Sequence, residues 1–551
     1  MSKTNYISSL RLALLNFATV FITFAIPSFA QTDESDYFNF RGSLSLSSDL
    51  YSVKGIQARQ PKNQQRLILR TNFTLFKQID IPFELYLSNQ DSRFLQPFNQ
   101  FGVSPRISNW LRLHGGYFYS NLSDFTFGDI KLFGGGIELT PGNFRLKAYI
   151  GRSRVAKEPD SLRSFGGIYK QNVYAFMIGY GNESKAFLNF NFIKAIDDSN
   201  SINPISFSER PIENLVGSAS FGLRIIQPLF ITGEVAASLF SSDITARKIE
   251  EIKLPKYLFT PRISSQIDAA ARFNIDINPQ TFWSLRLGTK WVGPGFYTAG
   301  FTQLQNDLLE FTVDPSLRLL ENKLNFRGSI GIRKNNVRNN KLSNTNRFLG
   351  MFNADYQISQ IFGINLQYSN NQIRARQYAD SLKISNVLNM ISISPRFSFQ
   401  AFNGMNNVSL NYSHQSSEDS SPFYSGKVFN KTNTINFIHS IFFPSTFNLN
   451  TSFLYSNVSL SNFNVKIISI NEVVGHQFFS NKLTLSLNLG YSITKAIKSN
   501  GFFITGLRAN YNLNKFGNFS FYVTNNNFSS SDPLSPNFNE LTGSLQYLIN
   551  F

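Results

Sequence analysis

Hydrophobic and polar residues alternate along most of the chain. In KLTLSLNLGY (482–491) every second residue is Leu or Tyr, and the residues between them are polar or glycine. NKLNFRGSIGIR (322–333) repeats the pattern. Successive side chains of a β-strand point to opposite faces, so each segment predicts a strand with one apolar and one polar face.

We count about 24 such segments, spaced at roughly 20 residues per strand plus connection. They begin at YFNFRGSLSL (37–46) and run to the last residue without a helical stretch. Beyond residue 30 no apolar run reaches the ~18 residues that a membrane helix needs. Alternation alone also fits a soluble β-sandwich or a solenoid, and three features separate these readings.

The first feature is the final strand, GSLQYLINF (543–551), whose apolar face ends on Phe551. It resembles the terminal strand that bacterial outer-membrane barrels present to their assembly machinery. The second is TFWSLRLGTKW (281–291), which places Trp283 and Trp291 on one face. Eight steps of about 3.3 Å span roughly 26 Å, close to the apolar band of a barrel wall.

The third feature is the alternation of short and long connections. PGN (141–143) and the turn at Pro444 are short, whereas the predicted long polar loops are 195–214, 241–260, 370–386 and 414–431. Short periplasmic turns and long outer loops are typical of outer-membrane barrels, which also pair every backbone polar group. The sequence therefore predicts an all-β protein, a single large antiparallel transmembrane β-barrel of roughly 22–26 strands in the cell outer membrane.

The first thirty residues have the composition of a signal peptide. The basic residues Lys3 and Arg11 come before an apolar stretch (12–26). The small residues Ser28 and Ala30 follow it, so cleavage is expected before Gln31. An uncleaved membrane anchor is the alternative. The predicted division is 1–30 signal peptide and 31–551 barrel. The first strand then begins within about ten residues of the mature terminus, so no amino-terminal plug domain is expected.

Composition narrows the chemistry. The chain has no cysteine, which excludes disulfides and thiolate sites. Its formal charge of +18 falls to +16 when the two basic residues of the signal peptide are removed. This charge predicts contact with outer-membrane lipid and lipopolysaccharide. The basic residues are spread over many segments, so no nucleic-acid partner is expected.

Two stretches, 96–152 and 291–331, resemble segments of an uncharacterised family of large outer-membrane β-barrels of Bacteroidota. The resemblance implies the same fold and compartment and carries no catalytic residues. Where such barrels commonly read Asp-Pro-Gly, this chain has Gly293, Pro294 and Gly295, which puts any role of that acidic residue in doubt.

The polar face of each strand predicts which residues line the lumen. The basic candidates are Arg70, Arg112, Arg145, Lys147, Arg224, Arg272, Arg286, Lys290, Arg327, Arg333 and Arg508. The acidic candidates are Glu84, Glu138, Glu234, Asp268, Glu310 and Asp355. They predict either cross-strand ion pairs that stiffen the wall or a net positive lumen that prefers anions.

The sequence predicts no catalytic, cofactor or metal site, and no enzyme. His414 opens HQSSED (414–419), which we interpret as a solvated loop rather than part of a hydrolase site. His114 shares the inward face with Arg112, and His439 falls on an apolar face.

Two functions remain. The first is a passive or gated solute channel, with an anion preference set by the inward Arg and Lys residues. The alternative is a non-catalytic barrel that binds an unidentified protein partner and scaffolds or gates a secretion or surface assembly. The lumen is narrowed by in-folded loops, filled by a partner, or left as a pore.

Overall fold

A computed structural model describes residues 37–551 except 90–99, 129, 162–163, 207, 253, 256, 280–281, 342, 378–383, 420–427 and 462. Segment 1–30, predicted to be a signal peptide, lies outside the described residues. The described chain is all-β, with one 3-10 turn at Asn514–Phe516. Within it no helix is long and apolar enough to cross a membrane.

The first strands are β1 (Phe38–Lys54), β2 (Asn63–Leu75), β3 (Ile79–Ser88), β4 (Gln100–Val103), β5 (Arg106–Ile107), β6 (Leu111–Tyr119), β7 (Lys131–Leu139), β8 (Phe144–Arg154) and β9 (Gln171–Asn182). The next are β10 (Ala186–Asp197), β11 (Glu213–Ile226), β12 (Leu229–Ser241), β13 (Ser265–Ile277), β14 (Trp283–Val292), β15 (Leu308–Leu319), β16 (Leu324–Lys334), β17 (Ser343–Gln357) and β18 (Phe362–Gln377). The last are β19 (Ile384–Ala401), β20 (Gly404–Asp419), β21 (Val428–Phe442), β22 (Asn448–Ser459), β23 (Asn464–Phe478), β24 (Leu483–Lys495), β25 (Ser499–Asn512), β26 (Asn518–Ser530) and β27 (Phe538–Asn550).

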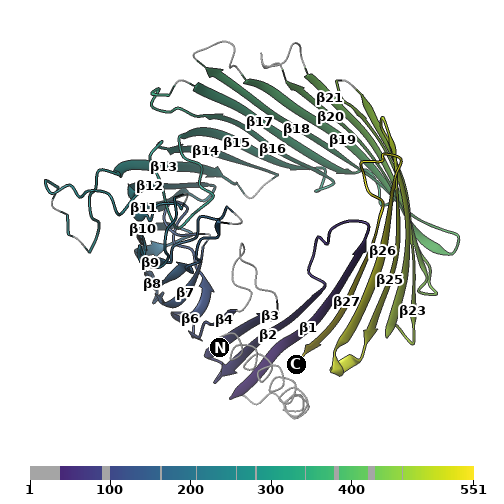
Figure 1. Ribbon diagram of the computed structural model, residues 1–551, viewed down its shortest axis with the longest axis horizontal. Coiled ribbons are helices and arrows are strands. Elements are labelled where there is room, and N and C mark those ends of the chain that lie inside the picture. Colours follow the sequence, from purple (N-terminus) through teal and green to yellow (C-terminus); the bar gives the residue numbers. More distant parts are fainter. Residues whose placement is uncertain are drawn as a thin grey trace.

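These strands form one closed antiparallel barrel, which confirms the prediction of a single large all-β barrel. Neighbours in sequence pair throughout, and β1 pairs with β27 to close the ring, as Figure 1 shows. Because β4 and β5 both pair with β3 and with β6, they share one place in the wall. The described strands thus occupy 26 places.

The closing seam joins the two ends of the described chain. The backbone of Gly42 exchanges two hydrogen bonds with that of Phe551, at 2.7 and 2.9 Å. The Phe551 ring packs against Phe40 with their centroids 5.0 Å apart. Gly42 fits there because a Cβ atom would lie 2.7 Å from the Phe551 ring.

Connections at one end of the barrel are short, such as 140–143, 227–228 and 402–403, and several at the other end are long. The predicted loops at 195–214 and 241–260 correspond to connections 198–212 and 242–264. The predictions for 370–386 and 414–431 were wrong in extent. Polar residues there continue the strands, so β18 to β21 leave only 378–383 and 420–427 between them, which lie outside the described residues.

The two faces of the wall differ in what they contact. In β9, Tyr174, Phe176 and Ile178 are exposed, while the alternate residues Val173 and Ala175 are buried. Figure 1 shows connecting segments crowded against the inner side of the wall around β10 to β13. We call the face that carries these segments the inner face, and the opposite, apolar face the outer face.

Candidate functional site on the inner wall

Two connections pack against the inner face and against each other. Segment 120–130 follows β6, and segment 293–307 follows β14. Phe127 and Gly300 form a parallel β-bridge, and Gly128 N donates to Gly300 O at 3.0 Å. We call the two segments together the inner buttress.

Aromatic side chains anchor the buttress to the wall. Phe125, Phe127 and Phe296 are almost completely buried, and the rings of Phe125 and Phe296 meet edge to face at 5.8 Å. They join a single apolar cluster whose wall members are mostly small or aliphatic, and these include Val173, Ala175, Met177, Ile193, Ala195, Val216, Ala236 and Ala270. Small residues on the wall let the aromatic rings approach closely, so this part of the barrel has a packed core on its inner side.

Polar wall residues bind the buttress backbone. Asn214 on β11 is fully buried, donates from Nδ2 to Tyr297 O at 3.0 Å, and accepts from Ala299 N at 2.9 Å. Ser238 on β12 donates to the same Tyr297 carbonyl at 2.5 Å. Buried backbone groups must be hydrogen-bonded. The Asn214 side chain provides these hydrogen bonds for the backbone groups of Tyr297 and Ala299, which have no neighbouring strand there.

An ion-pair network fixes the other segment. Arg272 on β13 pairs with Asp124 of segment 120–130, and its Nη2 lies 3.9 Å from Glu234 Oε2 on β12. Glu234 is 1 % exposed and accepts no well-formed hydrogen bond from the described residues. Lys290 lies 5.7 Å above the Phe125 ring. The Glu234 carboxylate is therefore buried beneath the buttress, with Arg272 and Lys290 as its cationic neighbours.

Asp268 explains the glycines of Gly293-Pro294-Gly295. Its carboxylate accepts from Gly295 N at 2.7 Å and pairs with Arg338. A Cβ atom on Gly293 would lie about 2.5 Å from Asp268 Oδ2. The Asp268 carboxylate of β13 therefore fills the space beside Gly293, and a side chain at position 293 would collide with it.

Asp307 holds the end of the buttress to the next connection. Val337 N donates to its Oδ1 at 2.9 Å, and Lys341 pairs with its Oδ2. Burial by itself raises the pKa of Asp307, but these hydrogen bonds outweigh it and hold the pKa below the ordinary value. The carboxylate therefore stays ionised and keeps both contacts at neutral pH.

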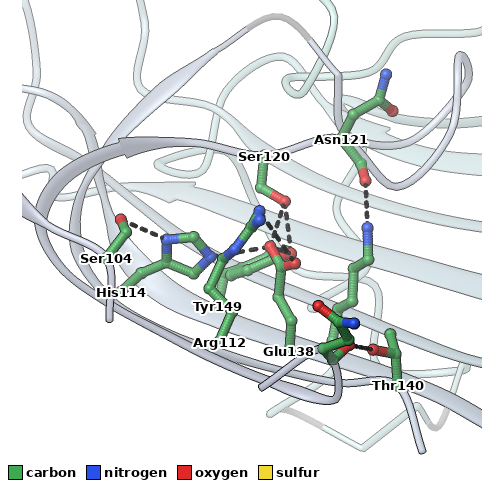
Figure 2. Close-up of polar contacts among 10 residues, drawn as sticks. Ser104, Arg112, His114, Ser120, Asn121, Glu138, Thr140 and Tyr149 are labelled. Atoms are coloured by element: carbon green, nitrogen blue, oxygen red, sulfur yellow. Dashed lines mark hydrogen bonds and ion pairs between the residues drawn. The ribbon is translucent and has the colours of Figure 1, made fainter. Parts of the chain in front are cut away.

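Glu138 on β7 is the centre of a second polar cluster, drawn in Figure 2. Its Oε1 accepts from Tyr149 OH at 2.8 Å, from Ser120 Oγ at 3.2 Å, and contacts His114 Nε2 at 2.9 Å. Ser104 Oγ lies 3.0 Å from His114 Nδ1. His114 is buried and stacks on the Phe118 ring at 4.7 Å. One carboxylate oxygen therefore contacts three polar groups, which link β6, β7 and β8.

The predicted lumen residues fall into paired and unpaired groups. Six arginines face carboxylates: Arg70–Glu84 at 2.8 Å, Arg112–Glu138 at 3.8 Å, Arg145–Glu183 at 3.9 Å, Arg272 with Asp124 and Glu234, Arg286–Asp276 at 2.5 Å, and Arg333–Glu310 at 2.6 Å. Lys147 and Arg224 instead donate to backbone carbonyls, at 3.3 and 2.7 Å. Asp355 pairs with Arg396 at 2.9 Å. The exposure of this set to a conducting lumen stays a prediction.

Arg327 and Arg508 differ from the rest. Both are exposed, and among the described residues neither has a carboxylate within ion-pair distance. Arg508 lies over the Tyr522 ring at 5.1 Å. A cavity of about 860 Å³ lies next to the Glu138 cluster and is lined by residues including Arg70, Glu84, Arg106, Arg112, His114 and Lys131.

Sequence reasoning missed Asp124 and Asn214. Asp124 lies in a connection, where alternation carries no information about direction, and Asn214 gave no signal that distinguishes it from other polar wall residues. The prediction that HQSSED forms a loop was wrong, because these residues end β20 and His414 Nδ1 lies 2.7 Å from Asn433 Oδ1 on β21.

No protein-family model and no curated protein matches the chain. Solved structures that are similar to this chain include an Escherichia coli P pilus tip assembly intermediate (PapC-PapD-PapK-PapG), with TM-score 0.47, 11 % identity, and coverage of 93 % of this chain and 61 % of that chain. The siderophore receptor PirA of Pseudomonas aeruginosa gives TM-score 0.38 and 10 % identity over 94 % of this chain and 81 % of that one. OccAB4 of Acinetobacter baumannii gives 0.28 and 12 % over 69 % and 98 %.

Proposed function

We propose that this protein is an integral barrel of the bacterial outer membrane that conducts solutes passively through a lumen narrowed on one side by the inner buttress. The observation that carries the proposal is the closed wall of 26 places, apolar outside and polar inside, whose packed inner core is confined to β6 to β15. A barrel this wide cannot be filled by wall side chains alone. We place no separate plug domain in the lumen.

The half of the wall away from the buttress is lined mainly by uncharged polar groups. Gln367, Ser392 and Ser413 are direct neighbours across β18 to β20. On the same face Asn411 Nδ2 donates to Ser394 Oγ at 2.5 Å. Amide and hydroxyl groups hydrate well without binding ions tightly, which suits passage of hydrophilic solutes.

Arg327 and Arg508 support an anion preference. The six paired arginines are largely neutralised by their carboxylates, so the unpaired cations dominate the field along the inner wall. Lys147 and Arg224, which donate to backbone carbonyls, also lack a carboxylate partner among the described residues, so substituting Arg327 and Arg508 removes part of the uncompensated charge.

Planar-bilayer recordings test the proposal. The wild-type protein is expected to conduct, and its reversal potential in a KCl gradient should favour chloride. R327Q/R508Q should move the reversal potential toward zero, because it removes two unpaired cations. R70Q/E84Q is the matched control, since it removes an exposed ion pair without changing net charge. A silent wild-type protein, or equal potentials for both variants, would refute the channel or its anion preference respectively.

Export belongs to the same proposal. Segment 1–30 is removed before Gln31, and the strand that ends at Phe551 is recognised by the barrel assembly machinery. Amino-terminal sequencing of protein from outer-membrane fractions checks the cleavage. Membership in the Bacteroidota barrel family stays a prediction from the resemblance.

A partner-binding barrel is the second candidate, because the inner face also carries apolar side chains. Met351 is 54 % exposed, and it pairs with Ser329 and Ser369 on the inner face of β16 and β18. Methionine is frequent on surfaces that bind polypeptides. A stoichiometric protein that co-purifies from native membranes, together with silence in bilayers, would favour this candidate over the channel.

A further inference from the structure

The outer face carries an unusual pair of lysines at one edge of the barrel. Lys466 on β23 and Lys495 on β24 are direct cross-strand partners, and both are exposed. Like charges placed opposite each other on a sheet are destabilising unless an anion lies between them. Among the described residues no carboxylate lies within ion-pair distance of either lysine.

This edge is the one that bears the long connections. Counting strands around the ring, connections 460–463 and 496–498, which flank the lysine pair, emerge at the same end as 198–212 and 242–264. The chain termini of β1 and β27 lie at the opposite end. In outer-membrane barrels the end with long loops is extracellular, so the lysines lie at the level of the outer leaflet.

Apolar and aromatic residues lie directly below the lysines. The pairs next in register are Ile468 with Ile493 and Ile470 with Tyr491. Ile468, Ile470 and Tyr491 are exposed on the outer face. A ligand bound by the lysines therefore meets acyl-chain surface below and water above, which is the environment of a lipid headgroup.

A row of aromatic and amide side chains continues this surface toward the seam between β27 and β1. Tyr491 pairs with Phe503, Phe503 with Asn527, and Asn527 with Asn539. Asn539 in turn pairs with the exposed Lys54 of β1. The residues of this row line a cavity of about 470 Å³. Asn539 Nδ2 donates to Asn527 Oδ1. The Nδ2 group of Asn527 and the Oδ1 atom of Asn539 take no part in this hydrogen bond.

Gly501 keeps the cavity open. A Cβ atom there would lie 2.9 Å from Ser529 Oγ and 3.7 Å from Tyr491 OH. The cavity thus combines amide and hydroxyl groups, which bind sugar hydroxyls, with aromatic rings at its lower edge and a lysine at its end.

We propose that the outer face of β23 to β27 and β1 binds a phosphorylated glycolipid of the outer leaflet, with Lys466 and Lys495 on a phosphate and the Asn527–Asn539 cavity on the sugar. This inference rests on the proposed outer-membrane location. It goes beyond a general attraction of basic residues to anionic lipid, because it assigns the headgroup to one segment of the rim and requires a sugar as well as a phosphate.

The test is native mass spectrometry of the purified full-length barrel with a bisphosphorylated glucosamine-disaccharide lipid, and with phosphatidylglycerol as the anionic lipid that lacks the sugar. The wild-type protein should bind the glycolipid more tightly. K466Q/K495Q should weaken that binding by roughly tenfold or more, and N527A/N539A should abolish the preference over phosphatidylglycerol. K482Q/K515Q, which removes two exposed lysines from the opposite edge of neighbouring strands, is the matched control and should bind as wild type.

Equal binding of the two lipids by the wild type would overturn the proposal, as would equal weakening in K466Q/K495Q and K482Q/K515Q. Bilayer conductance of K466Q/K495Q distinguishes a failure of the glycolipid proposal from a failure of the channel proposal. The substituted side chains lie on the outer face, so conductance should equal that of the wild type whether or not the glycolipid binds.

Discussion

Gly300 shows how one residue determines whether the two buttress segments can touch. Its β-bridge to Phe127 brings the backbones so close that a Cβ atom would overlap Thr126 O and approach Ile193 Cδ1 to 2.8 Å. Neither neighbour can yield easily, since Thr126 and Ile193 are fully buried. The requirement for glycine here is therefore steric.

G300A is expected to destabilise the barrel by about 2 kcal/mol, because an extra methyl group in a packed interior forces the backbone to shift. Equilibrium urea unfolding in lipid vesicles measures the change. G217A is the control, since a Cβ atom at Gly217 meets no heavy atom within 4 Å. Equal free energies of unfolding for the two variants would contradict this account of the bridge.

Asp307 gives the buttress a defined pH dependence. Its folded-state pKa is lowered, so its contribution to stability is complete above the unfolded-state pKa and is lost as the pH falls through the lower folded value. The wild type should exceed D307N in Tm by a constant amount from about pH 8 to pH 5, and the difference should shrink below about pH 4. A difference that grows as the pH falls would reverse the sign assigned here.

Strand β13 illustrates how buried and exposed ion pairs differ within one element. Arg272 lies over the buried Glu234, whereas Arg286 on the adjacent β14 pairs with Asp276 with 61 % of its own side chain exposed. Removing Arg272 leaves a buried carboxylate with less compensation, but removing Arg286 leaves Asp276 accessible to water. The same chemical pair therefore has unequal energetic weight on neighbouring strands.

R272M is expected to cost about 3 kcal/mol of stability and R286M less than about 1 kcal/mol. Urea unfolding of both variants in vesicles makes the comparison. R272M/E234Q is the rescue variant, because it removes the buried Glu234 charge together with the Arg272 charge that compensates it. A failure of E234Q to recover stability would show that the cost of R272M comes from its contact with Asp124 instead.

The strands were predictable because alternation is a local property. Residues 483–491 lie in β24 and residues 324–333 lie in β16, and Trp283 and Trp291 share a face of β14 as predicted. The buttress was not predictable, because its decisive contacts join Thr126 to Thr298, which the chain separates by 172 positions. Of the ion pairs, Arg333–Glu310 joins two residues already predicted to face inward, whereas Asp124 could be found only from the structure.

At the scale of the whole molecule the lumen is asymmetric. One side of the ring carries a packed core, where Figure 1 shows the crowding near β10 to β13, and the other side carries a polar wall. In the proposed channel, the buttress and not the number of strands alone then sets the width available to solutes.

Replacing residues 121–128 with a Gly-Ser linker of equal length is expected to raise single-channel conductance, because it removes Phe125 and Phe127 from the inner side. Replacing 531–537, a connection between β26 and β27 at the rim, is the control and should leave conductance near that of the wild type. Unchanged conductance in the first variant would show that the buttress does not limit the path.

The seam between Gly42 and Phe551 has a consequence for biogenesis. Its two partners lie at opposite ends of the described chain, so the ring cannot close until the strand that ends at Phe551 is available. Until then β1 and β27 each present one unpaired edge, and such edges readily join the wrong neighbour. In the proposed export to the outer membrane, the unfinished chain therefore needs an escort until the ring has closed.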